Sequence, residues 1–282
     1  MLPMTSDTDL TQAGDLALLY GKDGKRLILR LQSGAEVQTH HGVLKHDVLI
    51  GIEWGSRCQS HLGYPFVLLQ PSLDDLLLHI RRRSQIVFPK EIGVVLLRLS
   101  VAPGKTIVEA GSGSGAMTTA LAWAVGEQGR VHSFDRRADM QSLALENLQR
   151  LGLEKQVTFH LRDISEGFDV TGADGLFLDL ASPELYLAQA RKAIRGGTSL
   201  AAILPTTNQV QALVEALPAS GFGFIEVCEM LQRFYKPVAA RLRPVDRMVA
   251  HTGYLVFARA VAPEVLAEIP AAQGDESDTA PE

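Results

Sequence analysis

Three glycines spaced two residues apart form the first pattern in this chain that could do chemistry. The segment VEAGSGSG (108–115) follows a strand-like apolar run and precedes a helix-like run from Met117 to Val125, which Gly126 ends. Glycine lets the backbone turn sharply and approach a ligand closely, and a helix N-terminus offers free N–H groups. The spacing is not the GxGxxG of dinucleotide folds, and the loop has neither GK[ST] nor GxSxG. These features predict a binding loop at a strand-to-helix turn.

Acidic residues accompany the ends of the first three predicted strands. Glu109 lies just before the glycines, Asp135 ends the next apolar run, and Asp163 follows the third. Asp135 could accept both hydroxyls of a ribose, Asp163 an adenine amino group, and Glu109 could hold an amino acid or stabilise the loop. S-adenosylmethionine offers these groups and no phosphate, so it is the cofactor that we expect. A nicotinamide cofactor, or a plain turn with surface carboxylates, is the alternative.

Asp179 follows the strongly apolar run that closes the fourth predicted strand, within LDLASPE (178–184). Methyltransferases directed to the 6-amino group of adenine carry Asn/Asp-Pro-Pro-aromatic at this point, and this chain does not. Ring N1 has its own lone pair and becomes cationic on methylation, so a carboxylate beside the base would stabilise the developing charge. Asp179 is therefore the predicted catalytic residue. Its alternative role is to cap a helix that begins at Pro183.

The pattern around these residues predicts an α/β protein. From residue 105 to 261, strand-like runs alternate with helix-like ones, such as 138–151, and the last two strands, 223–231 and 253–258, follow each other as an antiparallel pair. This alternation predicts a mostly parallel, Rossmann-like sheet. The other strand-like runs are 106–110, 131–134, 157–161, 175–180 and 199–204.

The flanking segments suggest a domain order. Short apolar runs between turn residues predict a small β-rich domain over 15–70, and 71–104 predicts two linking helices. One covers 72–83, with Ser72 as N-cap and Arg81 to Arg83 in its last turn; the other covers 89–100 and opens with Pro89. We expect a flexible leader at 1–14 and a disordered acidic tail at 262–282.

Basic residues gather in two places, although the formal net charge is −5. Six carboxylates lie in 262–282 and two in 1–9, so the intervening body is mildly basic. Arginine beside aromatic side chains suits RNA, through phosphate contact and base stacking; a solvated surface is the alternative. The first cluster is Arg81, Arg82 and Arg83; the second includes Arg233, Phe234, Tyr235, Lys236, Arg241, Arg243 and Arg247.

Other features narrow the class of protein. Cys58 and Cys228 lie far apart, and His40, His41 and His46 have no acidic ligands nearby in the sequence, so we expect no metal site. The chain has neither a secretory signal nor an apolar run long enough to span a membrane, which favours the cytoplasm.

Several segments resemble, in order, motifs of the tRNA adenine-N1 methyltransferases, over roughly residues 15–260. They are QIVFPKE (85–91), IVEAGSGSGAMT (107–118), FLDLASPE (177–184), LPTTNQV (204–210) and HTGYLVFAR (251–259). The resemblance implies a class I S-adenosylmethionine-dependent fold, methylation of adenine 58 in the tRNA T loop, and a homotetramer. Some archaeal members also modify adenine 57.

The resemblance also implies roles for individual residues. Asp179 is the implied catalytic carboxylate, and the small N-terminal domain is implied to handle RNA and pack subunits. Arg81, Arg82, Arg83, Arg233, Arg241 and Arg243 are the expected RNA contacts. The expected cofactor contacts are Gln85, Glu109, Gly111, Gly113, Ser114, Gly115, Ala116, Met117, Asp135, Asp163 and Asp179.

This chain departs from the family pattern at three positions. Phe88 replaces a frequent Tyr, Glu184 replaces a frequent Trp after Pro183, and Asp135 replaces a frequent Glu. The first two bear on how the target base fits. Two other readings stay open: a methyltransferase of a small molecule or protein carboxyl, and a non-catalytic tRNA-binding subunit. The retained glycines and Asp179 argue against the second.

Overall fold

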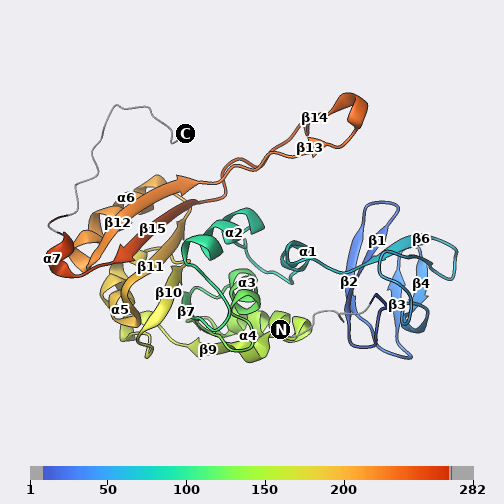
Figure 1. Ribbon diagram of the computed structural model, residues 1–282, viewed down its shortest axis with the longest axis horizontal. Coiled ribbons are helices and arrows are strands. Elements are labelled where there is room, and N and C mark those ends of the chain that lie inside the picture. Colours follow the sequence, from blue (N-terminus) through green and yellow to red (C-terminus); the bar gives the residue numbers. More distant parts are fainter. Residues whose placement is uncertain (1–8, 267, 269–282) are drawn as a thin grey trace. The chain divides into compact units, whose positions relative to one another are not determined.

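A computed structural model describes residues 9–266 and 268 and confirms the predicted α/β class. A seven-stranded sheet has the strand order β12-β15-β11-β10-β7-β8-β9, and a separate four-stranded sheet lies near the N-terminus (Figure 1). The chain divides into two compact units, the first ending at Asp163 and the second beginning at Ile164.

The N-terminal part of the first unit is a small antiparallel module. Its sheet has the order β2-β1-β6-β5, and β3 pairs with β4 in a separate hairpin. Alternate residues of β6 point into a core that contains Leu19, Leu31, Phe66 and Leu68, as a one-sided sheet requires. The strands are β1 (Leu16–Gly21), β2 (Arg26–Arg30), β3 (Glu36–Thr39), β4 (Gly42–Lys45), β5 (Arg57–Gln59) and β6 (Pro65–Leu69), with a 3₁₀ turn at His46–Val48.

The module begins earlier than its predicted boundary. Thr11 is 1% exposed, and its hydroxyl donates to the carbonyl of Leu49 at 2.5 Å. The backbone N–H of Thr11 also donates to the Ile52 carbonyl. Residues 10–14 of the predicted leader are therefore held by the module, whereas residues 1–8 lie outside the described residues.

The first linking helix is shorter than predicted. Helix α1 covers Leu73–Leu78, and Ser72 forms the predicted cap by accepting from the backbone N–H of Asp75. The prediction that the helix continues to Arg83 is wrong. The backbone N–H and carbonyl of Arg81 bind the side chain of Asn147 instead, so tertiary hydrogen bonds replace helical ones there. Helix α2 (Pro89–Arg98) begins with the predicted proline.

The remainder of the first unit contains three parallel strands. Strand β7 (Thr106–Ala110) pairs with β8 (Arg130–Asp135), which pairs with β9 (Val157–Leu161). Helix α3 (Ala116–Val125) contacts β7 and β8, and α4 (Ala138–Leu151) contacts β8 and β9. A 3₁₀ turn at Glu154–Gln156 precedes β9. The carboxyl ends of these strands therefore carry the loops that hold the predicted site residues.

The second unit contains the rest of the large sheet. Strands β10 (Ala173–Leu178) and β11 (Ile194–Leu204) are parallel, whereas β15 (Tyr254–Ala260) pairs antiparallel with β11 and with β12 (Phe222–Glu229). The predicted antiparallel pair at the end of the fold is confirmed. The helical elements are α5 (Leu187–Ala193), α6 (Thr207–Ala216), α7 (Pro263–Leu266) and 3₁₀ turns at Ile164–Glu166, Pro183–Tyr186, Pro218–Ser220 and Ala239–Arg241.

A long hairpin leaves the sheet between β12 and β15. Its short strands β13 (Tyr235–Lys236) and β14 (Arg243–Pro244) pair antiparallel, and they extend beyond the ends of β12 and β15 (Figure 1). Helix α7 lies within the predicted acidic tail, of which residues 267 and 269–282 lie outside the described residues. None of the described helices is long and apolar enough to cross a membrane.

Gly115 stands where helix α3 passes close to α4. Its φ of +85° is left-handed, and a Cβ there would lie 3.0 Å from both Cα and Cβ of Ala144 in α4. Gly113 also has a positive φ of +50°, but nothing lies within 4 Å of its Cβ position. A side chain would therefore be conformationally strained at both positions, but it would press against close neighbours only at Gly115.

We expect Gly115→Ala to lower the free energy of unfolding by about 2–4 kcal/mol, because left-handed strain adds to overpacking against a helix backbone. The matched Gly113→Ala should cost about 1–2 kcal/mol, from strain alone. Urea unfolding of both variants measures the difference. Equal losses would contradict the assignment of Gly115 to a packing contact.

Candidate active site

A buried carboxylate organises the glycine loop. Glu109 is 0% exposed, and its Oε2 accepts from the hydroxyls of Thr118 at 2.7 Å and Ser133 at 2.5 Å. Ser133 lies opposite Glu109 in the β7–β8 register, and its hydroxyl also lies 2.6 Å from that of Ser112. Of the two roles left open for Glu109, these contacts favour stabilisation of the loop, because the carboxylate joins β7, β8 and α3.

Asp135 connects the end of β8 to the same loop. Its Oδ2 accepts from the backbone N–H of Gly113 at 3.2 Å, and its Oδ1 accepts from the backbone N–H of Arg137 at 2.9 Å. The backbone N–H of Gly111 donates to the carbonyl of Phe134 at 2.8 Å. The loop is therefore fixed against β8 by both backbone and side-chain hydrogen bonds.

The predicted cofactor residues differ in exposure. Gly111 and Gly113 are half-buried and Gln85 is exposed, whereas Ser114, Gly115, Ala116 and Met117 are buried. Asp163 is half-buried and lies just beyond β9, where the N–H of neighbouring Arg162 donates to the Asp135 carbonyl. The structure thus brings Glu109, the loop, Asp135 and the segment leading to Asp163 together within the first unit. Gln85 has no described contact with them.

Asp179 lies in the second unit, directly after β10. The three preceding residues, Leu176 to Leu178, are fully buried, whereas Asp179 is exposed. The N-cap position of the following 3₁₀ turn belongs to Ser182, so Asp179 does not occupy the capping position proposed as its alternative role. The carboxylate of Asp179 is therefore exposed immediately after the buried end of β10.

Two of the family-like segments support the chain beyond Asp179. Thr206 caps α6 by accepting from the backbone N–H of Gln209, and the Gln209 side-chain amide donates to the carbonyl of Ala181 at 2.8 Å. The His251 ring lies 3.0 Å from the carbonyl of Pro205 through Nε2, and 2.6 Å from Glu229 through Nδ1. LPTTNQV and HTGYLVFAR thus fix the loops near the ends of β10 and β11.

The two arginine clusters are both exposed. Arg81, Arg82 and Arg83 occupy the irregular segment after α1. On the hairpin, Lys236 and Arg243 both lie close to Asp246, at 2.7 Å and 3.5 Å. Large apolar side chains are also exposed along this hairpin: Leu231, Phe234, Tyr235, Val238, Leu242, Met248 and Val249.

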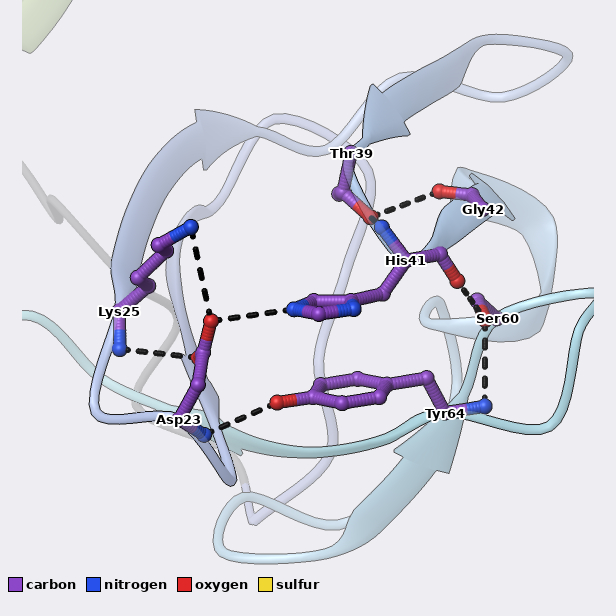
Figure 2. Close-up of polar contacts among 7 residues, drawn as sticks. All are labelled: Asp23, Lys25, Thr39, His41, Gly42, Ser60 and Tyr64. Atoms are coloured by element: carbon purple, nitrogen blue, oxygen red, sulfur yellow. Dashed lines mark hydrogen bonds and ion pairs between the residues drawn. The ribbon is translucent and has the colours of Figure 1, made fainter.

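His41 and His46 of the N-terminal module have structural partners. The His41 ring stacks on Tyr64, with centroids 3.7 Å apart, and its Nε2 lies 3.0 Å from Asp23 Oδ2 (Figure 2). This hydrogen bond holds the pKa of the Asp23 carboxyl below its ordinary value. His46 Nδ1 accepts from the backbone N–H of Gln32. No group of three potential metal ligands occurs within the described residues.

An open cavity of about 470 Å³ adjoins this stack. It is lined by the apolar Leu19, Leu27 and Phe66 and by polar side chains that include Lys25 and Gln38. The backbone around His41 is fixed as well, because Ser60 donates its hydroxyl to the His41 carbonyl at 2.6 Å (Figure 2). The module therefore brings polar and apolar side chains together around one cavity.

Sequence reasoning did not single out four residues that shape the loop: Ser112, Thr118, Ser133 and Asn147. Ser133 could have been found only from the β7–β8 register, which pairs it with Glu109. Asn147 lies on α4 and binds backbone atoms of Arg81 and Ser114. No local pattern marks the contacts of Ser133 with Glu109 and of Asn147 with Arg81, because these partners lie 24 and 66 residues away.

The chain is similar to known tRNA methyltransferases in sequence and in structure. It is 32% identical over 275 residues to a Methanocaldococcus jannaschii protein named tRNA (adenine(57)-N(1)/adenine(58)-N(1))-methyltransferase TrmI, covering 88% of this chain and 96% of that protein. A crystal structure of the Aquifex aeolicus tRNA (m1A58) methyltransferase TrmI matches with a TM-score of 0.75 and 32% identity, over 90% of this chain and 99% of that one.

A second solved structure carries a different description. It is an S-adenosylmethionine-dependent O-methyltransferase from Thermotoga maritima, with a TM-score of 0.83 and 40% identity, over 92% of this chain and 97% of that one. Two family models also match: the TrmI-like N-terminal family over residues 11–57, and the tRNA methyltransferase complex GCD14 subunit family over residues 63–242. The chain therefore belongs to the GCD14 family of tRNA methyltransferases, as its motifs predicted.

Proposed function

We propose that this protein transfers a methyl group from S-adenosylmethionine to N1 of adenine 58 in the T loop of tRNA. The observation that carries the proposal is the loop of Gly111–Gly115, fixed by the buried Glu109 and by Asp135, in a chain with tRNA adenine-N1 methyltransferases as relatives. Use of adenine 57 as well, as in the name of the archaeal relative, is a variant of the same proposal.

The residues of the first unit fit this cofactor. Gly113 leaves open space on its Cβ side, so ligand atoms can approach its backbone. Asp135 Oδ2 accepts the Gly113 N–H and retains a lone pair that suits a ribose hydroxyl. Asp163, half-buried just beyond β9, is the proposed partner of the adenine, and Gln85 is a further proposed cofactor contact. When bound, the cofactor supplies an electrophilic methyl group on a sulfonium.

Asp179 is the proposed catalytic residue. Ring N1 of adenine attacks with its own lone pair, so no proton has to leave the nucleophile before transfer. The charge that develops on the ring spreads to the 6-amino group, from which a carboxylate can accept a hydrogen bond. Gln209 holds the Ala181 carbonyl two residues further on, which restricts the backbone that carries Asp179.

A different substrate is the second candidate, because the Thermotoga maritima relative is described as an O-methyltransferase. Incubation of unmodified tRNA with the protein and S-adenosylmethionine, followed by mass spectrometry of the nucleosides, separates the two. New 1-methyladenosine is the expected product. A 2′-O-methylated nucleoside, or no methylated nucleoside from a protein that binds the cofactor, would move the substrate to the second candidate.

We also propose that the exposed arginines bind tRNA and that copies of this chain assemble into a homotetramer in the cytoplasm. The hairpin carries exposed arginines together with exposed apolar side chains, so it offers both an RNA surface and a packing surface. Arg81 to Arg83 and the N-terminal module are the other proposed RNA contacts.

Asp179→Ala should reduce the rate of 1-methyladenosine formation roughly 100-fold or more, since it removes a preorganised group from the charged transition state. Cofactor affinity should fall far less than this rate, although Asp179 is also an expected cofactor contact, because the glycine loop and Asp135 remain in place. Single-turnover assays measure the rate, and Glu215→Ala, which removes an exposed carboxylate from α6, is the control. Normal turnover by Asp179→Ala would rule out this mechanism.

The double variant Arg241→Glu/Arg243→Glu should weaken tRNA binding and flatten its salt dependence by roughly one to two units of log–log slope, as expected for two lost phosphate contacts. Lys155→Glu/Lys192→Glu makes the same charge change on exposed residues elsewhere. Sedimentation of each variant comes first, because the hairpin is also a proposed packing surface. Unchanged tRNA affinity in a normally assembled variant would place the RNA surface elsewhere.

A further inference from the structure

Asn147 makes three hydrogen bonds from the buried face of α4. It is 1% exposed. Its Oδ1 accepts from the backbone N–H of Arg81 at 3.1 Å, and its Nδ2 donates to the carbonyls of Arg81 at 2.8 Å and Ser114 at 2.9 Å. One side chain therefore joins two segments that lie 33 and 66 residues away from it in sequence.

The two joined segments are those predicted to meet the two substrates. Ser114 belongs to the glycine loop, and Arg81 begins the exposed basic segment that leads to Gln85. A second link runs directly between them, because the backbone N–H of Arg83 lies 3.4 Å from the Ser114 hydroxyl. The basic segment is not helical, so its backbone depends on such tertiary contacts for a fixed position.

Of the side chains with this shape, only an amide can make all three hydrogen bonds at this position. The site needs one acceptor, for the Arg81 N–H, and donors for two carbonyl oxygens. An ionised carboxylate of the same shape accepts but cannot donate. It would face two carbonyl oxygens in a buried place, where leaving polar groups without partners is costly.

We propose that Asn147 is a positioning residue that holds the glycine loop and the basic segment in a fixed relation, so that loss of its donated hydrogen bonds weakens cofactor binding and loosens the 81–83 backbone together. The cofactor part rests on the proposed function. The backbone part does not, since it concerns the protein alone.

The near-isosteric variant Asn147→Asp tests the proposal by calorimetric titration with S-adenosylhomocysteine. We expect the dissociation constant at pH 8 to rise about tenfold or more, as expected for lost buried hydrogen bonds. Burial and the two facing carbonyls favour the neutral form of the new carboxyl, whereas His79 and Arg150, which line the same pocket as Asn147, favour the charged form when they carry a positive charge. The protonated carboxyl can donate to one carbonyl, so the defect should shrink at pH 6. A variant that had only lost stability would show fewer binding sites at an unchanged dissociation constant.

Gln149→Glu is the matched control, because it makes the same chemical change at an exposed position of the same helix. It should bind like the unaltered protein at both pH values. If Asn147→Asp does not fold, the uncharged Asn147→Ser, which can donate only one hydrogen bond, takes its place. It should give the same loss without the pH dependence.

Limited digestion with trypsin gives a readout without ligand. Cleavage after Arg81, Arg82 and Arg83 should become several-fold faster in Asn147→Asp, whereas cleavage in the 233–247 hairpin should not change. Unchanged digestion after Arg81–Arg83 together with an unchanged dissociation constant would overturn the proposal. If the unaltered protein fails to bind S-adenosylhomocysteine, the proposed function fails, and the digestion alone decides the role of Asn147.

Discussion

The burial of Glu109 is the constraint on which the rest of the site depends. A carboxylate without water is tolerated only when hydrogen-bond donors surround it. Here Thr118 and Ser133 donate to the same oxygen, and Ser112 contacts Ser133 in turn. The two hydrogen bonds to Oε2 of this buried group therefore fix the end of β7, the start of α3 and the neighbouring strand in one arrangement. The glycine loop connects β7 to α3, so this arrangement also determines its conformation.

Two further side chains of the first unit bind the glycine loop. Asp135 binds the loop through Gly113, and Asn147 binds it through Ser114. The loop is thus held by three side chains from β7, β8 and α4. A loop held by several contacts suits a binding site, because a preorganised loop loses little conformational entropy when a ligand binds. In the second unit, Gln209 provides comparable support for the chain beyond Asp179.

Much of the fold could be predicted because its cues are local. Apolar runs gave the bounds of β7 and β9, Ser72 marked the start of α1, and Gly126 the end of α3. The helix over 72–83 was predicted too long, since Asn147 takes the backbone groups of Arg81. Ser133 was missed for a similar reason, because only the register of β7 and β8 brings it to Glu109. Local propensity does not encode contacts of this kind.

We propose that the loop of Gly111–Gly115 and Asp135 form the cofactor site. A crystal structure of the protein with S-adenosylhomocysteine tests it most directly. The ligand should lie against the backbone of Gly111 and Gly113, with its ribose hydroxyls within hydrogen-bond distance of the Asp135 carboxylate. A ligand bound elsewhere, or a ribose that does not reach Asp135, would contradict it.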